Sequence, residues 1–209
     1  MIFNDIDQLQ SYFEPGFRDI PEERQSILAD CAASITDQLI KNSSTSVVVI
    51  CTHNSRRSQL GELMIACAAK VYGIDSLKSY SGGSEATAFN HRMVNALITE
   101  GISFKLLEAG EKPRYVTSIA GEPFENEFFS KKYDHDFNSK QNFVAVHVCD
   151  SADETCPHII GASARYFIPY VDPKVSDDSP KEAEVYGAKV TEIGKEMFFM
   201  VKQVKEKLQ

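Results

Sequence analysis

The chain has 209 residues and is 43% hydrophobic, which is enough apolar material for one domain with a sizeable core and an extension. Its formal net charge of −8 argues against a general nucleic-acid binder, so an anion site must be a local positive spot on an acidic surface. The chain lacks both an apolar run of the ~18 residues that span a membrane and a signal-peptide pattern, so we expect a cytoplasmic protein with no membrane partner. Five irregularly spaced cysteines are not typical of a secreted disulfide framework and direct attention to catalytic or redox thiols.

Residues 1–44 are predicted to form a helical extension in front of the main domain. The apolar spacing over Ile6–Phe13 predicts a short helix that ends near Pro15 and the glycine that follows it. Pro21, followed by two glutamates, is typical of the first turn of a second helix. Cys31 lies on the apolar face of that helix and is interpreted as a core residue.

The next stretch has the pattern of a buried strand, a short loop and a helix. The uncharged run Val47–Ile50 is typical of a buried parallel strand, and the apolar spacing over Leu60–Val71 predicts an amphipathic helix. Between them, Cys51 and Arg57 are separated by five residues. Such a connection directs backbone N–H groups and a helix N-terminus at an anion. We refer to residues 51–58 as the nucleophile loop.

The side chains of the nucleophile loop suit a cysteine that attacks a bound oxyanion. The helix N-terminus and Arg57 favour the thiolate of Cys51, and the guanidinium offers two parallel donors to a tetrahedral anion. Ser58 is expected to donate to the sulfur, and Asn54 tolerates left-handed backbone angles. The alternative is a strand-end cysteine and a surface arginine spaced so by accident, but the flanking strand and helix favour catalysis. The residues predicted to bind the oxyanion are Thr52, His53, Asn54, Ser55, Arg56 and Arg57.

A second strand and helix follow. Leu77–Tyr80 is predicted to be a short strand, and Ser81–Ser84 is a glycine-rich loop that by itself indicates no more than a turn. The apolar spacing over residues 91–100 predicts a helix, and Gly101 ends it. Cys67, on the preceding helix, is interpreted as a core residue.

Residues 104–141 are predicted to be a small β insert of unassigned role. Two extended segments, Phe104–Leu107 and Arg114–Ile119, flank a turn that contains glycine and proline. Residues 127–133 are a candidate third strand. We expect this insert to be an antiparallel addition on the edge of the main sheet.

A further buried strand, Phe143–Val148, runs directly into Cys149, and Cys156 follows seven positions later. That spacing is too wide for an ordinary zinc knuckle. The two cysteines are either a redox pair or two unrelated thiols.

The last predicted strand, Ala164–Tyr170, leads to Asp172 and Pro173. A carboxyl beside an oxyanion can supply a proton to a leaving oxygen, and the proline restricts the backbone of the aspartate before it. The alternative is a plain surface turn, since Asp177 and Asp178 show that acidic residues are common here. We favour Asp172 as the general acid.

Ser179–Glu182 has the pattern of a capping box, with proline in the first turn, and begins a long helix that extends to Leu208. Strands and helices therefore alternate through residues 45–209. This alternation predicts a doubly wound α/β domain with a four-stranded parallel sheet.

The nucleophile loop resembles that of the low-molecular-weight protein tyrosine phosphatase family, and within it the thioredoxin-coupled arsenate reductases. The resemblance covers about residues 46–103 and 143–209, and it implies the sheet order 2-1-3-4. His53 stands where the family usually has glycine, and Arg56 where many reductases have a second loop cysteine. The positions on the reductase-like pattern are Cys51, Asn54, Ser55, Arg57, Ser58, Gln59 and Glu62, together with the stretch SGGSEATAFNHRMVNALITEGI.

The resemblance implies a catalytic relay. Cys51 attacks arsenate held by Arg57 and Ser58, with Asp172 as the proton donor. Cys149 attacks the adduct and releases arsenite, and Cys156 resolves the product as a disulfide that thioredoxin reduces. No tightly bound cofactor is implied, although Asn54, Glu62 and Ser81 match some ligands of a potassium ion in such reductases.

Two other functions stay open at this level. The first is a phosphatase that acts on phosphotyrosine or another phosphomonoester through Cys51, Arg57 and Asp172 alone. Only Lys174 and Val175 follow the Asp-Pro pair, where tyrosine phosphatases of the family usually place aromatic residues, which favours a small oxyanion. The second is a non-catalytic redox or anion sensor. It stays open because His53 and Arg56 depart from the family's loop pattern.

Overall fold

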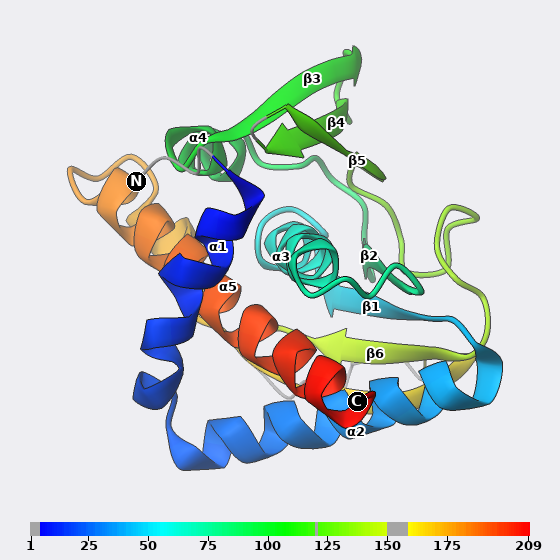
Figure 1. Cartoon of the computed structure of the whole chain (residues 1–209). Helices are drawn as coiled ribbons and strands as arrows, with labels where there is room; N and C mark the ends of the chain where they lie inside the picture. Colours follow the sequence, from blue (N-terminus) through cyan, green and yellow to red (C-terminus); the bar gives the residue numbers. More distant parts are fainter. Residues whose placement is uncertain (1–4, 120, 150–158) are drawn as a thin grey trace.

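A four-stranded parallel sheet lies at the centre of the molecule, in the strand order β2-β1-β6-β7 (Figure 1). The computed structural model describes residues 5–119, 121–149 and 159–209. Numbered along the chain, the parallel strands have the order 2-1-3-4, so the predicted α/β fold and the sheet order implied by the resemblance are confirmed. The four strands are β1 (Thr45–Cys51), β2 (Leu77–Gly83), β6 (Phe143–His147) and β7 (Ala162–Phe167).

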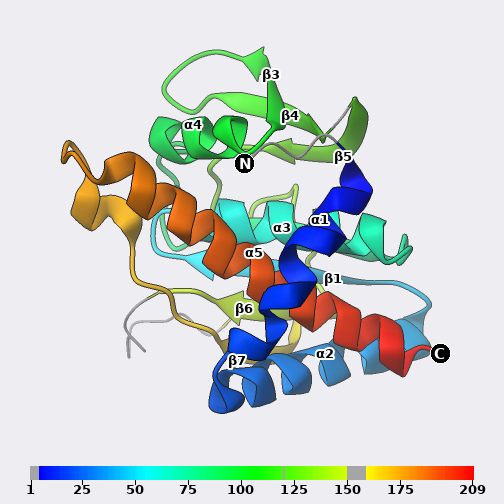
Figure 2. The same cartoon turned by 60° about the vertical axis from the view of Figure 1, so that its left-hand side comes forward.

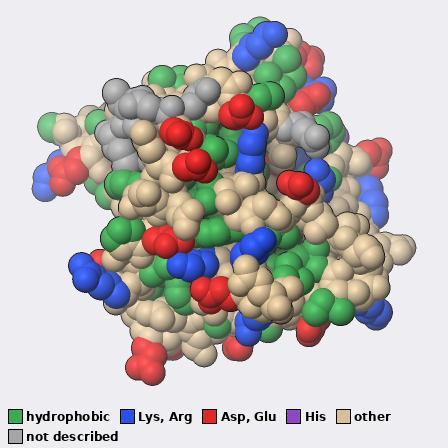
Figure 3. Space-filling view, viewed as in Figure 1, with side chains coloured by type: hydrophobic (Ala, Val, Ile, Leu, Met, Phe, Trp, Pro, Cys, Tyr) green, Lys and Arg blue, Asp and Glu red, His purple; other side chains and the backbone are tan. Residues whose placement is uncertain are grey.

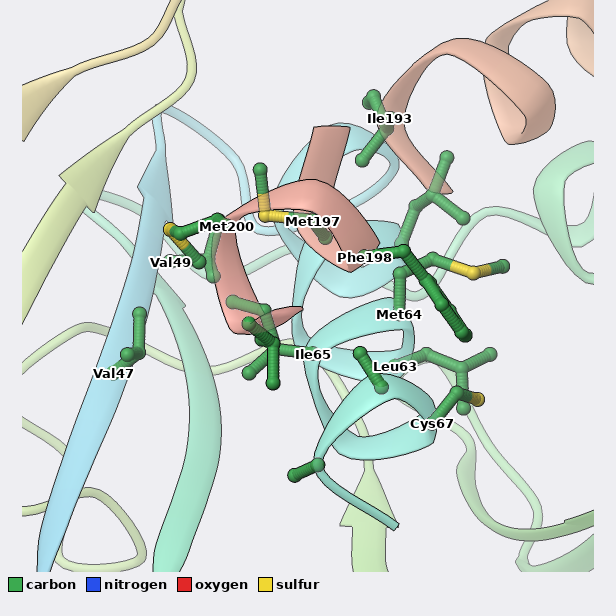
Figure 4. Packing of buried hydrophobic residues seen from close by; sticks show 14 of the residues in the cluster. Val47, Val49, Leu63, Met64, Ile65, Cys67, Ile193, Met197, Phe198 and Met200 are labelled. Atoms are coloured by element: carbon green, nitrogen blue, oxygen red, sulfur yellow. The ribbon is translucent and has the colours of Figure 1, made fainter. Parts of the chain in front are cut away.

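Both faces of β1 are buried, which explains its uninterrupted apolar run. Val47 and Val49 share one core with the helices α2 (Glu22–Asn42), α3 (Arg57–Val71) and α5 (Glu182–Lys207). Figure 4 shows these two valines facing apolar side chains of α3 and α5. The alternate residues of the strand, Val48 and Ile50, join a second, smaller cluster with Phe143, Ala145 and Ile159. A parallel strand with both faces covered needs apolar residues at every position.

The N-terminal residues belong to the same core. The helix α1 (Ile6–Phe13) forms as predicted and is followed by the 3-10 helix η1 (Glu14–Asp19), and α1 contacts both α3 and α5 (Figure 2). The ring of Phe13 lies 4.6 Å from that of Phe198 on α5. The extension is thus tied to the domain through buried aromatic contacts.

The strands of the insert form a separate antiparallel sheet, so our expectation that they would extend the edge of the main sheet is wrong; Lys132, beyond those strands, forms an isolated bridge with Gly83 of the edge strand β2. Its three antiparallel strands have the order β3-β4-β5 and lie beyond α3 and beside α4 (His91–Thr99) in Figure 1. Three aromatic rings at right angles anchor it, since Phe104 and Tyr115 pack against Phe89, which precedes α4. The strands are β3 (Ile102–Glu108), β4 (Arg114–Ile119) and β5 (Glu122–Phe128).

Three boundaries differ from the sequence-based expectations. The third strand of the insert ends at Phe128, and residues 129–133, which we call the exit segment, lead back to the main domain. The strand β2 extends through Gly83, so the glycine pair expected in a loop lies within the strand. The long helix begins at Glu182, later than the Ser179 start that the capping-box pattern suggested; in the turn before it the Ser179 hydroxyl accepts from the backbone N–H of Lys181 at 3.3 Å, and the Glu182 carboxylate accepts from that of Asp178 at 2.7 Å.

The described residues contain no helix with the length and apolar character needed to cross a membrane. Acidic and basic side chains are interspersed on the face shown in Figure 3, with no extended area of a single charge there.

Candidate active site

The nucleophile loop connects the end of β1 to the start of α3, as the sequence predicts. Cys51 is the last residue of β1 and is 5% exposed, and α3 begins at Arg57. Because β1 and β6 are parallel neighbours, their carboxyl ends lie at the same end of the sheet. Cys149, just after β6, therefore lies against the loop. The Cys149 sulfur lies 3.6 Å from the hydroxyl oxygen of Thr52.

The Cys51 sulfur has a hydroxyl partner whose hydrogen is oriented toward it. The hydroxyl oxygen of Ser58 lies 3.0 Å from the sulfur. The same oxygen accepts from the side-chain amide of Asn54 at 2.9 Å. Since the amide can only donate, the hydroxyl hydrogen is free to point at the sulfur, where it stabilises a thiolate. Asn54 has the left-handed φ of 47° that its residue type tolerates.

The carbonyl groups of the loop are bound on its outer side. The carbonyl of Thr52 accepts from the backbone of Glu85 at 2.9 Å, and that of Ser55 accepts from the backbone of Asn90 at 2.9 Å. The carbonyl of His53 accepts from the hydroxyls of Thr87 and Ser130 at 3.1 and 3.0 Å. In a trans peptide the N–H points opposite to the carbonyl, so these bonds direct the following N–H groups toward the inside of the loop. Inward N–H groups form an anion-binding concavity.

Arg57 and Asp172 form an ion pair at the mouth of the loop. One terminal nitrogen of Arg57 donates to the backbone carbonyl of Tyr170 at 2.7 Å, and the other donates to the Asp172 carboxylate at 2.9 Å. Arg57 is buried, whereas the Asp172 side chain is 24% exposed. The second carboxylate oxygen of Asp172 accepts from the backbone of Lys174 and so caps the short helix η2 (Pro173–Ser176). The arginine and the aspartate predicted from sequence are therefore brought together, and each is held by a backbone contact.

Arg56 lies near the same aspartate, with its Nε 4.0 Å from the Asp172 carboxylate, but its hydrogen bonds are to other groups. Its Nε donates to the hydroxyl of Tyr186 at 2.8 Å, and its Nη2 donates to Asp177 at 3.0 Å. Burial, together with the hydrogen bond to Asp177, raises the pKa of Tyr186 to about 12, so this hydroxyl stays protonated at neutral pH. Arg56 thus ties the loop to α5 and to the segment that carries Asp172, although we predicted it as an oxyanion ligand.

The remaining predicted loop side chains point away from a shared centre. The His53 ring is more than half exposed and lies 3.7 Å from the Glu85 carboxylate. The Ser55 hydroxyl donates to the carbonyl of Ala88 at 2.8 Å. Their contribution to anion binding would come through the backbone N–H groups described above.

The thiol of Cys149 is protonated at neutral pH in this state. Burial raises its pKa, and the neighbouring Cys51 adds to the increase, while Thr52 and Arg57 act in the opposite direction. Cys156, the other half of the predicted redox pair, lies outside the described residues. Cys31 and Cys67 are buried free thiols, as predicted for core residues.

The residues that resemble potassium ligands do not fit a potassium ion here. The carboxylate of Glu62 accepts from the Ser81 hydroxyl at 2.6 Å and lies 3.7 Å from the ammonium of Lys131. The side-chain oxygen of Asn54 accepts from the backbone N–H of Lys131 at 2.8 Å. The oxygen atoms are thus engaged, and a cation already stands beside the carboxylate. The sequence analysis missed Lys131, because a lysine is expected to be exposed to solvent and is almost never fully buried unless it is paired.

Comparison with known proteins supports the assignment of the loop. Residues 46–119 match the family model of the low molecular weight phosphotyrosine protein phosphatases. Among solved structures, a thioredoxin-dependent arsenate reductase of Corynebacterium glutamicum is similar at 18% identity and a TM-score of 0.36, over 82% of this chain and 67% of that one. No curated protein matches the chain. The family match contains the nucleophile loop and agrees, over residues 46–119, with the resemblance seen in the sequence.

Proposed function

We propose that the protein reduces arsenate to arsenite through a thiol relay coupled to thioredoxin. The observation that supports this most directly is the place of Cys149, whose sulfur lies against Thr52 of the nucleophile loop. A phosphatase needs one thiol, whereas the reduction of an oxyanion needs a second thiol within reach of the first. The absence of aromatic residues after Asp172 and Pro173 adds support, because Val175 is small and largely exposed.

In the first step the thiolate of Cys51 attacks arsenate, a sulfur–arsenic bond forms, and one oxygen leaves as water. The inward N–H groups and Arg57 hold the anion, and Asp172 in its protonated form supplies the proton to the leaving oxygen. The entering oxyanion competes with Asp172 for the donors of Arg57.

In the second step the Cys149 thiol loses its proton to solvent, which is easier once the bond to arsenic has removed the opposing Cys51 charge, and the resulting thiolate attacks the Cys51 sulfur. The electron pair of the sulfur–arsenic bond goes to arsenic, which leaves as arsenite, and a disulfide joins the two cysteines. Cys156 then attacks Cys149, which frees Cys51 and forms the Cys149–Cys156 disulfide, and thioredoxin reduces that bond. Two thiols thus supply the two electrons that arsenate gains.

A side-by-side assay tests this function. Arsenate-dependent NADPH oxidation with thioredoxin and its reductase is measured beside aryl phosphate hydrolysis, for the wild type and for the Cys51→Ser, Cys149→Ser and Cys156→Ser variants. We expect Cys51→Ser to lose both activities, because a serine hydroxyl is a far weaker nucleophile than a thiolate. We expect the other two variants to lose turnover with arsenate and to keep hydrolysis. Cys31→Ala, on α2, is the control that keeps both.

The second candidate is a phosphatase, which the description of the matching family model favours. Hydrolysis of a phosphomonoester would use the same thiolate, arginine and acid, with water in place of Cys149. Robust hydrolysis by the wild type, with no Cys149–Cys156 disulfide after arsenate treatment by mass spectrometry, would replace the reductase proposal with this one.

A further inference from the structure

Beneath the nucleophile loop lies a lysine with no exposed side-chain surface. Lys131 belongs to the exit segment, and its side chain is 0% exposed. Its ammonium lies 3.7 Å from the Glu62 carboxylate and 3.5 Å from the carbonyl of Phe129. The same nitrogen lies 4.6 Å from the centre of the Phe129 ring and 5.8 Å from that of Phe137. A carboxylate, a carbonyl and two ring faces are groups that together hold a cation.

The carboxylate partner is equally buried. The Glu62 side chain on α3 is 1% exposed, and its oxygens accept from Ser81 at 2.6 Å and from Asn126 at 3.3 Å. Burial raises the pKa of Glu62 and lowers that of Lys131, while the attraction between the two opposite charges counteracts both shifts. A charged pair this deep persists only where its hydrogen bonds are satisfied.

The same lysine is connected to the nucleophile. Its backbone N–H donates to the side-chain oxygen of Asn54 at 2.8 Å, and Asn54 donates to Ser58, whose hydroxyl contacts the Cys51 sulfur. Gln59 donates to the carbonyl of Phe129 at 2.8 Å and to Asn54 at 3.1 Å, which fastens the exit segment to the start of α3. The insert therefore supports the loop from below.

Glycines in β2 make this contact possible. A Cβ at Gly82 would stand 2.3 Å from the backbone of Tyr133, and one at Gly83 would stand 2.5 Å from the carbonyl of Thr52. The exit segment and the nucleophile loop thus both approach β2 more closely than a side chain would allow.

We infer that Lys131 is the resident cation of the nucleophile loop, placed by the insert at the position where the resemblance implies potassium, so that the protein works without a monovalent metal ion. Lys131 is a positioning residue. Its ammonium holds Glu62, and its backbone orients Asn54 and thereby the hydroxyl of Ser58. The expected effect of Lys131 on catalysis rests on the proposed function. Whether the folded protein binds potassium does not depend on that function.

The first test uses the wild type. Its thermal unfolding is measured in potassium chloride and in choline chloride at equal ionic strength, with and without inorganic phosphate. We expect the same Tm in both salts, because the cation site is already filled. A saturable rise of the Tm that potassium alone produces would show a potassium site and overturn the inference.

The second test removes the ammonium. Lys131→Ala leaves Glu62 buried without a cation and opens space beside it, so we expect about a 10–100-fold loss of kcat/KM for arsenate and for aryl phosphate. Potassium, and not choline, should raise the Tm of this variant and restore part of the lost rate. A lysine that only fills space would show no such rescue, and a variant that potassium leaves unchanged would contradict the inference. Lys132→Ala, at the exposed neighbouring position, is the matched control and should behave as the wild type does.

A third variant keeps the test decisive if Lys131→Ala does not fold. Lys131→Met combined with Glu62→Gln removes both charges and retains most of the volume. We expect this protein to fold and to have a reduced kcat in either salt, because the loop has lost the pair that orders it. A wild-type kcat in the double variant would overturn the inference. If the salts act as expected on the Tm while arsenate reduction is absent in every variant, the proposed function has failed and the assignment of Lys131 stands.

Discussion

Two ion pairs of the site, one at its mouth and one at its floor, differ in burial and in what they can exchange. At the mouth, Arg57 binds Asp172, whose side chain is 24% exposed. At the floor, Lys131 binds Glu62, and neither side chain is more than 1% exposed. An entering anion can take the place of the Asp172 carboxylate, whereas nothing from solvent reaches Glu62. The mouth pair is therefore suited to exchange partners during turnover, and the floor pair to hold the loop in place.

The first prediction concerns the Arg57–Asp172 pair at the mouth and replaces its acidic member. Asp172→Asn keeps the size of the side chain but cannot act as an acid, so we expect a loss of ~10²–10⁴-fold in kcat. Binding of inorganic phosphate should be unchanged or tighter, because the amide competes less with the anion for Arg57. Steady-state rates and phosphate inhibition constants measure both effects. Asp178→Asn is the control, since Asp178 has an exposed side chain and a left-handed φ of 61° that asparagine accepts. A greater loss for the control would show that the acid is misassigned.

The second prediction breaks the floor pair. Glu62→Gln leaves the Lys131 ammonium buried without its counter-charge, so we expect the free energy of unfolding to fall by about 3–5 kcal/mol. Chemical denaturation measures the change. The control is Glu122→Gln, which disrupts an exposed pair with Lys70 and should cost about 0–1 kcal/mol. Equal effects of the two substitutions would contradict the difference between buried and exposed pairs on which the comparison rests.

The third prediction separates the two neighbouring arginines. Arg57→Lys loses the paired donors that bind Tyr170 and Asp172 and that would hold the anion in the proposed function, so we expect a loss of ~10²–10³-fold in kcat/KM. Arg56→Lys should lower the Tm more than it lowers the rate, because Arg56 contacts Tyr186 and Asp177 on neighbouring elements. Kinetics and thermal unfolding of both variants provide the measurement. If Arg56→Lys has the greater kinetic effect, Arg56 is the residue that holds the anion.

The smallest expected effect is on the pKa of the Cys149 thiol, beside Thr52 of the nucleophile loop. Burial raises the pKa of its thiol, so its alkylation in the free protein should become fast only above the ordinary titration range of a cysteine. Removing the neighbouring thiolate by Cys51→Ser should lower that pKa slightly, because the Cys51 charge opposes a second thiolate. Mass spectrometry of iodoacetamide-treated protein across pH measures both. A thiol of Cys149 that alkylates readily at neutral pH would contradict the protonated state described for it.

The sequence was sufficient for the parts of the protein that depend on neighbours along the chain. The strand, loop and helix around Cys51 follow from the apolar run before it and the helical spacing after it. For Cys149 and Asp172 the residues alone left alternatives open, and the resemblance supplied their roles; that both lie at the loop depends on which strands are neighbours in the sheet. The local order of strand, loop and helix around Cys51 is the part that needs no knowledge of long-range packing.

Only the tertiary structure decided how the insert and the charged residues are used. Lys131 is buried because the exit segment folds back under Asn54, which lies 77 positions earlier in the chain. Arg56 and Arg57 are adjacent and of the same residue type, yet their side chains leave the start of α3 in different directions. Arg57 donates to Asp172, whereas Arg56 donates to Asp177. The insert forms its own sheet because its aromatic residues pack beside α4 rather than along the edge of the parallel sheet. Each outcome depends on contacts between distant segments, and the periodicity of one segment does not encode them.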